Sequence, residues 1–413
     1  MSNLLNQKGL ARKIRRAYSI ILNWLPKKNW MHPNKPCIFY DVSRFWLTDN
    51  KTGIHRVVKK ILEELLRNSN KLNYEIIPVG ATFYRRGYFP LLYDLDKSKF
   101  CFQRCFIKPK KGDTFLSFES DLNVQSSQKD VLLKYKDLGC EVVIGVHDLL
   151  PIYLPEVFTK RMVKDFEHWL RSTCEYTSSY VCVSKTTKKT LINWLQDNNF
   201  PLPRIEYFHL GSDLPVLREN NAKEHLDFPM KLSDPCFLMV GTIEPRKQHL
   251  FVLKSFEILW NHGYDFTLMI IGKPGWKKNE ILEAINNSNF KDKYLYYYPD
   301  ADDSFLQHAY QNATSLIFAS LGEGFGLPLV EALFNKKFII CRNLEIFKEI
   351  AGNSASYFDT KNPDKFAEFI LGWVQKYKNG LIRINRDFRP ITWHESCDQL
   401  LSRLEIEIKE NSK

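Results

Sequence analysis

The strongest constraint on the fold is a regular alternation of short β-rich runs with segments of helical periodicity, which occurs in two series along the chain. In the first series the β-rich runs are residues 37–43, 74–80, 114–118, 141–147, 180–184 and 205–210. In the second series they are residues 236–241, 266–272, 294–299, 314–320, 337–341 and 355–358. Strands that alternate with helices are typical of parallel sheets with crossover helices. The sequence therefore predicts an α/β protein with two doubly wound, Rossmann-like domains.

A polar segment with three prolines, residues 213–235, separates the two series. Such a composition is typical of an interdomain linker. The 413 residues also exceed the roughly 250–300 at which a single hydrophobic core stops growing. We therefore expect an N-terminal domain at residues 37–212, a C-terminal domain at residues 236–392, and a final helix at residues 393–413.

The positive charge is concentrated at the N-terminus. The net charge is +12, and residues 1–40 alone contain eight basic side chains and no acidic one. The rest of the chain is only mildly basic, which argues against a nucleic-acid partner. Within the N-terminal segment 1–36, residues 8–28 alternate basic and apolar side chains at helical spacing. This pattern predicts an amphipathic helix on an anionic membrane surface, and the alternative is a helix docked on its own domain.

The cysteines and the hydropathy indicate the compartment. The nine cysteines are scattered and odd in number, as in a reduced cytoplasmic protein. Cys101 and Cys105 are the only close pair, and they lack the further ligands of a zinc site. No stretch approaches the ~20 apolar residues that span a bilayer. We expect a cytoplasmic protein that is peripheral on the inner face of the cytoplasmic membrane.

Two glutamates flank a glycine-rich turn directly after the run 314–320, in the sequence Glu323-Gly-Phe-Gly-Leu-Pro-Leu-Val-Glu331. The glycines allow close approach of a ligand, and Pro328 suits the first turn of a helix whose free N–H groups attract an anion. Taken singly, Glu323 could be a surface loop residue and Glu331 a partner of the helix dipole. Together they predict a site for a sugar nucleotide, whose hydroxyls donate to carboxylates.

A pair of adjacent cations, Arg246 and Lys247, follows the run 236–241. Such a pair is usually solvated when it stands alone. After the end of a parallel strand it is suited to neutralise a departing diphosphate.

The Glu323-to-Glu331 segment resembles the signature of retaining GT-B glycosyltransferases of the family 4 type, and the resemblance covers roughly residues 37–400. It implies two Rossmann-like domains that face a cleft, with the acceptor on the N-terminal side and the donor on the C-terminal side. It also implies a retaining, metal-independent transfer of a hexose from a nucleotide sugar. The Gly-Thr-x-Glu-Pro-Arg-Lys segment is similar to that of mannosyltransferases, which favours GDP-mannose as donor.

The resemblance assigns roles to residues. It implies that Glu323 contacts the donor sugar near the reacting carbon, that Glu331 holds the ribose hydroxyls, and that Arg246 and Lys247 stabilise the diphosphate. The backbone near the donor sugar and phosphates would be that of Gly324, Phe325, Gly326 and Leu327. Thr242 stands where many members of the family have an arginine.

Three further positions match the family. Gly53 opens a helix where the family has a glycine loop beside the donor phosphates. Lys273 lies near the nucleotide, although a solvated loop lysine is the alternative. His147 would contact the donor sugar, whereas a lone histidine after a strand is otherwise structural.

No metal and no cofactor are expected. Asp94-Leu95-Asp96 and Asp300-Ala301-Asp302 have the spacing of a metal-binding Asp-x-Asp motif, but neither has the expected strand-to-loop context. Arg246 and Lys247 can perform the charge neutralisation of a metal ion. The expected partners are a nucleotide sugar and a saccharide acceptor, for instance one linked to polyprenyl diphosphate in surface polysaccharide assembly. The alternatives are a non-catalytic nucleotide-sugar-binding scaffold and a nucleotide-sugar epimerase or phosphorylase.

Overall fold

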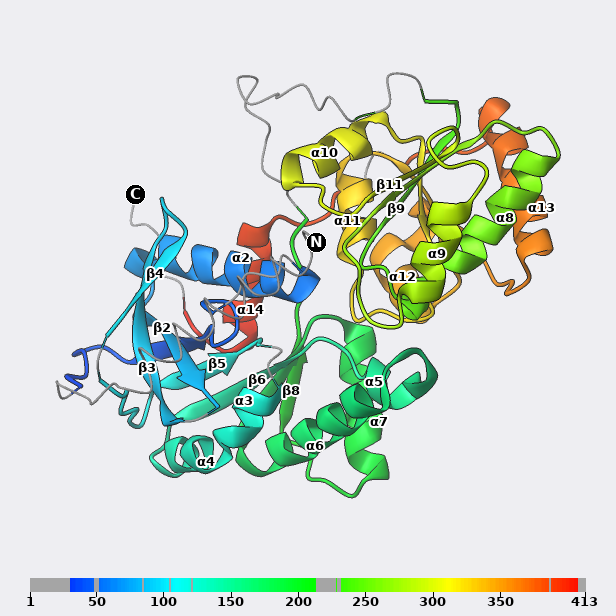
Figure 1. Ribbon diagram of the computed structural model, residues 1–413. Helices are drawn as coiled ribbons and strands as arrows, with labels where there is room; N and C mark the ends of the chain where they lie inside the picture. The colour runs from blue at the N-terminus through cyan, green and yellow to red at the C-terminus, as the bar shows by residue number, and fades with distance from the viewer. Residues whose placement is uncertain are drawn as a thin grey trace, which may run out of the picture.

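The computed structural model describes residues 30–47, 52–83, 85–103, 105–119, 122–212, 228, 232–385 and 388–407. The predicted helix at residues 8–28 lies outside this part of the chain, as does most of the predicted linker. The described strands form two sheets, each covered by helices, in two lobes (Figure 1).

The first sheet has the strand order β4-β3-β2-β1-β5-β6-β7-β8. Its strands are β1 Cys37–Asp41, β2 Glu75–Thr82, β3 Arg85–Asp94, β4 Lys99–Phe102, β5 Thr114–Ser117, β6 Glu141–Val146, β7 Ser179–Cys182 and β8 Arg204–Tyr207. Its helices include α2 Gly53–Arg67, α3 Leu122–Ser127, α4 Lys129–Asp137, α5 Leu150–Tyr153, α6 Lys160–Tyr176 and α7 Lys185–Asp197. The central strands pair in parallel and are buried on both faces, which explains why they read as continuous apolar runs.

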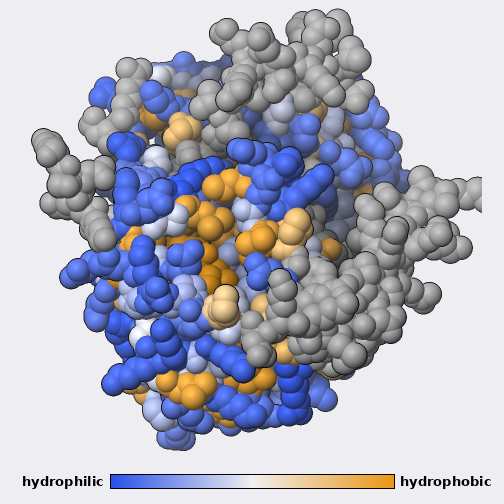
Figure 2. All heavy atoms as spheres, turned by 90° about the vertical axis from the view of Figure 1, so that its left-hand side faces the viewer, coloured by the Kyte–Doolittle hydropathy of each residue, from blue (hydrophilic) through white to orange (hydrophobic). Residues whose placement is uncertain are grey.

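The antiparallel strands β3 and β4 at the edge of this sheet were not predicted from the sequence. The β3 sequence contains Gly87 and Pro90, which weaken a strand pattern, although β3 is flanked by β2 and β4. Figure 2 views the molecule from this side and shows hydrophobic side chains gathered among hydrophilic ones. Leu92 and Leu95 of the β3–β4 hairpin, and Phe83 in the turn between β2 and β3, are exposed large hydrophobic residues.

The second sheet has the strand order β11-β10-β9-β12-β13-β14 and is parallel throughout the described pairs. Its strands are β9 Cys236–Val240, β10 Thr267–Ile271, β11 Leu295–Tyr298, β12 Ser315–Phe318, β13 Phe338–Arg342 and β14 Ser356–Phe358. Its helices include α8 His249–Asn261, α9 Asn279–Asn287, α10 Asp303–Asn312, α11 Leu327–Phe334, α12 Glu345–Ala351 and α13 Pro363–Lys378. The strand order reverses between β9 and β12, so ligands are expected beyond the carboxyl ends of these two strands.

The last described helix, α14 Trp393–Arg403, returns to the first lobe and packs against α2 and β8 (Figure 1). A capping box between Thr392 and Glu395 fixes its start. Gly211 allows the close approach, because a Cβ atom there would lie 2.4 Å from the backbone nitrogen of Trp393. Among the described residues, no helix has the length and apolar character required to cross a membrane.

Candidate active site

The loops after β9 and β12 bring Glu323 together with Arg246 and Lys247. The short 3-10 helix Pro245–Lys247 carries the two cations, and Glu323 lies between β12 and α11. Glu323 Oε2 is 2.7 Å from Arg246 Nη1, and Glu323 Oε1 is 2.5 Å from Lys247 Nζ. Arg246 also donates to the backbone oxygen of Gly322 at 2.8 Å and pairs with Glu244 at 2.6 Å. The three predicted residues therefore form one cluster at the reversal of strand order.

This cluster is buried, with only 10% of the Glu323 side chain and 11% of the Lys247 side chain exposed. Burial alone would raise the pKa of Glu323, but Arg246 and Lys247 together lower it to about 2. Burial lowers the pKa of Lys247 and raises that of Glu244, although Arg246 opposes the second shift. Arg246 and Lys247 therefore face the carboxylates of Glu323 and Glu244. An entering diphosphate would compete with Glu323 for the cations.

The signature turn packs against the first lobe. Gly324 is required at this contact, because a Cβ atom would lie 1.7 Å from the backbone oxygen of His147. Ser184, the N-cap of α7, donates its hydroxyl to the backbone oxygen of Gly324 at 2.7 Å. Gly326 precedes α11 with a φ of 108°, a conformation that favours glycine. The side chain of Leu327 lies next to Gly53 of the first lobe, within 3.6 Å of a Cβ atom built there.

His147 follows β6 and faces this turn through its backbone. Its Nε2 is 2.9 Å from the backbone oxygen of Phe118, so this nitrogen carries the proton. Burial lowers the pKa of His147, which makes the ring neutral with Nδ1 as an acceptor. Burial raises the pKa of the adjacent Asp148, while Arg246 in the other lobe opposes that shift. The electrostatic link from Asp148 to Arg246 was not predicted, although the His-Asp pair is visible in the sequence.

Glu331 lies in α11 and contacts two residues other than the cations near Glu323. Tyr310 of α10 donates its hydroxyl to Glu331 Oε2 at 2.8 Å. Arg56 of α2, in the first lobe, forms an ion pair with Glu331 Oε1 and also approaches Asp303 at 3.3 Å. Arg56 was not assigned a role from the sequence. The signal was available, because it lies three residues after Gly53 in the segment that resembles the family.

The family comparison agrees with this geometry. Residues 221–381 match the family model described as "Glycosyl transferases group 1". The matched residues include all six strands of the second sheet. The matched residues contain the cation pair Arg246 and Lys247 as well as the complete segment from Glu323 to Glu331.

Relatives of the whole chain include mannosyltransferases. The chain is 31% identical over 404 residues to the "Serotype-specific mannosyltransferase WbdA" of Escherichia coli, over 93% of this chain and 48% of that protein. It is 26% identical over 239 residues to the "O-antigen chain mannosyltransferase B" of Escherichia coli, over 56% of this chain and 61% of that protein. The chain thus spans about half the length of the WbdA proteins that it matches.

Solved structures share the fold at low sequence identity. The sucrose-phosphate synthase from Thermosynechococcus elongatus matches with a TM-score of 0.61 and 12% identity, over 90% of this chain and 98% of that one. Anabaena HepE, crystallised with UDP and glucose, matches with a TM-score of 0.59 and 11% identity, over 89% of this chain and 99% of that one. The prediction of a GT-B fold with two Rossmann-like domains is confirmed.

Two other predicted residues of the second lobe lie in neighbouring loops. Thr242 follows β9, and Lys273 follows β10 with an exposed side chain. The backbone joins these loops, because Ile243 donates its N–H to the Lys273 oxygen at 2.8 Å. Gly275 permits this packing, since a Cβ atom there would lie 2.6 Å from the Thr242 methyl group. Both residues therefore lie at the sheet edge that carries the Glu323 cluster.

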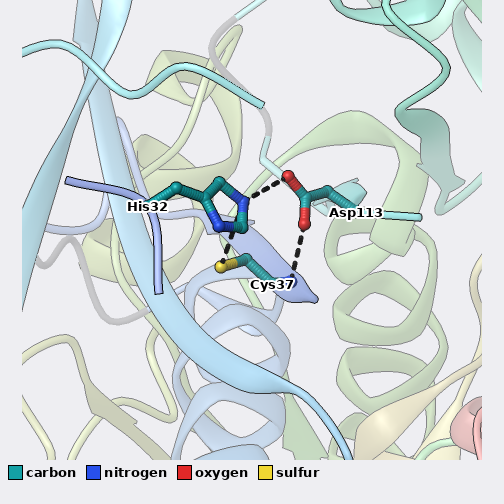
Figure 3. A group of neighbouring side chains, drawn as sticks. All are labelled: His32, Cys37 and Asp113. Atoms are coloured by element: carbon teal, nitrogen blue, oxygen red, sulfur yellow. Dashed lines mark hydrogen bonds and ion pairs between the residues drawn. The ribbon is translucent and has the colours of Figure 1, made fainter. Parts of the chain in front are cut away.

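A group of side chains that could hold a metal ion lies elsewhere. The ligand atoms of His32, Cys37 and Asp113 lie within 4.8 Å of one another (Figure 3). Cys37 begins β1 and Asp113 precedes β5, so the group is at the amino ends of these strands, away from the Glu323 cluster. Asp113 accepts from His32 Nε2 at 2.7 Å and from the backbone of Cys37 and Lys110, both at 2.8 Å. Burial raises the Cys37 pKa to about 12, which keeps the thiol protonated. We interpret the group as a hydrogen-bonded anchor of the sheet.

The two Asp-x-Asp segments have local structural roles. Asp302 caps the N-terminus of α10 and accepts from the Phe305 N–H at 2.8 Å. Asp94 accepts from the backbone of Asp96 and Lys97 in the turn after β3. Each carboxylate therefore stabilises the backbone next to it.

Proposed function

We propose that the chain is a retaining, metal-independent mannosyltransferase that transfers mannose from GDP-mannose to a saccharide or lipid-linked saccharide acceptor in surface polysaccharide assembly. The observation that carries this proposal is the buried cluster in which Glu323 contacts both Arg246 and Lys247. The cluster combines a carboxylate that can accept from sugar hydroxyls with two cations that can neutralise a diphosphate. The similarity of this chain to the WbdA and O-antigen mannosyltransferases supports the choice of sugar and pathway.

The cluster suggests an exchange of partners when the donor binds. The diphosphate of the donor takes Arg246 and Lys247, because it carries more negative charge than one carboxylate. Glu323 is then free to accept hydrogen bonds from the sugar. Neutral His147 has Nδ1 available as a further acceptor for a sugar hydroxyl.

The chemical step follows from the signature. The bond between the anomeric carbon and the diphosphate oxygen breaks while the acceptor hydroxyl attacks from the same face through an oxocarbenium-like transition state. The proton of that hydroxyl passes to the leaving phosphate oxygen. Arg246 and Lys247 stabilise the negative charge that develops on the diphosphate, so that no metal ion is required.

The acceptor side and the membrane complete the proposal. The exposed hydrophobic residues of the β3–β4 hairpin and the basic segment at residues 8–28 are suited to a lipid-linked acceptor at an anionic membrane. We therefore propose that the enzyme is cytoplasmic and peripheral on the inner face of the cytoplasmic membrane. Flotation with anionic liposomes should retain the intact chain and lose a chain without residues 1–30. Equal flotation of the two would overturn the membrane part.

A donor screen tests the main proposal. The intact chain is incubated with GDP-mannose and a panel of other nucleotide sugars, with and without a mannose-containing acceptor and with and without EDTA. We expect acceptor-dependent release of GDP and an α-linked product, unchanged by EDTA. Binding without turnover would instead indicate a scaffold. A change in the donor sugar would indicate an epimerase, and phosphate-dependent release of a sugar phosphate would indicate a phosphorylase.

A further inference from the structure

The carboxylate of Glu331 is shared between the two lobes. Its Oε2 accepts from Tyr310, which belongs to the same lobe, and its Oε1 is paired with Arg56 from the other lobe. The Glu331 side chain is only 3% exposed. Each carboxylate oxygen therefore already has a partner, and a ligand hydroxyl that approaches this buried group competes with Tyr310 or Arg56.

The two partners differ in how firmly they are held. Tyr310 is fully buried, and its hydroxyl also lies 3.2 Å from the backbone oxygen of Pro328. The side chain of Arg56 is 26% exposed, and its second partner, Asp303, is 66% exposed. Arg56 also belongs to α2 of the other lobe, whereas Tyr310 belongs to the same lobe as Glu331. Arg56 is therefore the partner that a ligand can displace.

We propose that Tyr310 positions Glu331 for the ribose of the nucleotide, and that Arg56 occupies the remaining carboxylate oxygen until the ribose hydroxyls displace it. This inference rests on the proposed function and on the role that the family resemblance implies for Glu331, which is to hold the ribose hydroxyls. Arg56 then sets the affinity for the donor, since part of the binding free energy is spent on separating it from Glu331. The contact also couples the approach of the two lobes to the state of the nucleotide site.

The two residues should act in opposite directions on nucleotide affinity. Removal of Arg56 leaves a buried carboxylate without its counter-charge, so hydroxyl donors bind to it more strongly. Removal of the Tyr310 hydroxyl takes away the group that orients the carboxylate. We expect Arg56→Gln to lower the Kd for GDP about tenfold and Tyr310→Phe to raise it about tenfold, each near the value of one hydrogen bond to a charged group.

Titration calorimetry with two probes, GDP and 2′,3′-dideoxy-GDP, tests this proposal on the full chain. Both probes carry the diphosphate, but only GDP carries the ribose hydroxyls. The two variants should therefore change the Kd for GDP and leave the Kd for the dideoxy probe as it is in the intact chain. Lys60→Gln, which removes a cation from the same helix, is the matched control and should change neither value.

The outcomes separate the inference from the proposed function. If the intact chain binds neither GDP nor any other nucleoside diphosphate, the proposed function fails. If the intact chain binds GDP but Arg56→Gln weakens or does not change that binding, the inference alone fails. An equal effect of either variant on both probes would also overturn it, because the effect would then come from the phosphates or from the packing of the lobes.

Discussion

The two ends of the signature segment show how differently two carboxylates of one motif can be held. Glu323 contacts Arg246 and Lys247, which belong to the same lobe and follow a strand adjacent to its own. Glu331, eight residues later, is paired with Arg56 of the opposite lobe. The first site is therefore organised within one domain, whereas the second depends on how the domains meet. This difference suggests that chemistry is built into the C-terminal lobe, while nucleotide affinity responds to closure.

The largest effect on activity is expected at Glu323, the first residue of the signature segment. Glu323→Gln keeps the shape of the side chain but removes the charge that holds both cations and replaces one of the two acceptor oxygens with an NH2 donor. We expect kcat to fall by about 10³-fold, the scale of losing a preorganised electrostatic contact. Steady-state GDP release measures it, with Glu280→Gln, an exposed glutamate of α9, as the control. A loss below tenfold would mean that Glu323 is dispensable for transfer.

The ion pairs of Glu323 should also make the stability of the fold depend on pH in the acid range. The Glu323 pKa is lowered from 4.5 to about 2, so its stabilisation is present above pH 4.5 and is lost as the pH falls toward 2. A shift of this size corresponds to about 3 kcal/mol. Urea unfolding of the intact chain and of Glu323→Gln should give a stability difference that shrinks between pH 6 and pH 3.5. A constant difference over that range contradicts the pairing.

The contact between the lobes can be tested at the signature glycines. A methyl group at Gly324 would meet the backbone oxygen of His147, whereas one at Gly322 would meet mainly the flexible side chains of Leu150 and Leu154. We expect Gly324→Ala to lower kcat about 100-fold by keeping the lobes apart, a loss of roughly 2.7 kcal/mol. Gly322→Ala should cost much less. Small-angle scattering should show a larger radius of gyration for Gly324→Ala only, and similar values for both would refute the steric argument.

The smallest effect is expected at Asp303, which helps to hold Arg56 beside Glu331. Because this ion pair is exposed, its contribution is screened by solvent. Asp303→Asn should lower the Kd for GDP by about two- to threefold, in the same direction as Arg56→Gln. Calorimetry at low and at 0.5 M salt should show the effect fade with salt. A change in the opposite direction would mean that Asp303 contributes to nucleotide binding itself.

Much of the architecture could be read from local patterns. Each of the predicted β-rich runs contains a strand, because buried parallel strands are continuous apolar segments bounded by polar turns. The β3–β4 hairpin was missed, because β3 contains a glycine and a proline and β4 has only four residues, so neither shows that pattern. The cluster of Glu323, Arg246 and Lys247 could also be anticipated, since the carboxyl ends of neighbouring parallel strands share one edge of the sheet.

The sequence by itself therefore determined the class of fold, which residues form strands, and the chemistry of the residues in the loops after those strands. Only the tertiary structure decided that Gly324 meets His147, that Asp148 acts on Arg246, and that Arg56 reaches Glu331 across 275 residues of chain. The physical reason is that periodicity and turn chemistry act over a few residues. Contacts between the lobes depend on how two folded domains pack against each other, and no local sequence pattern encodes that packing.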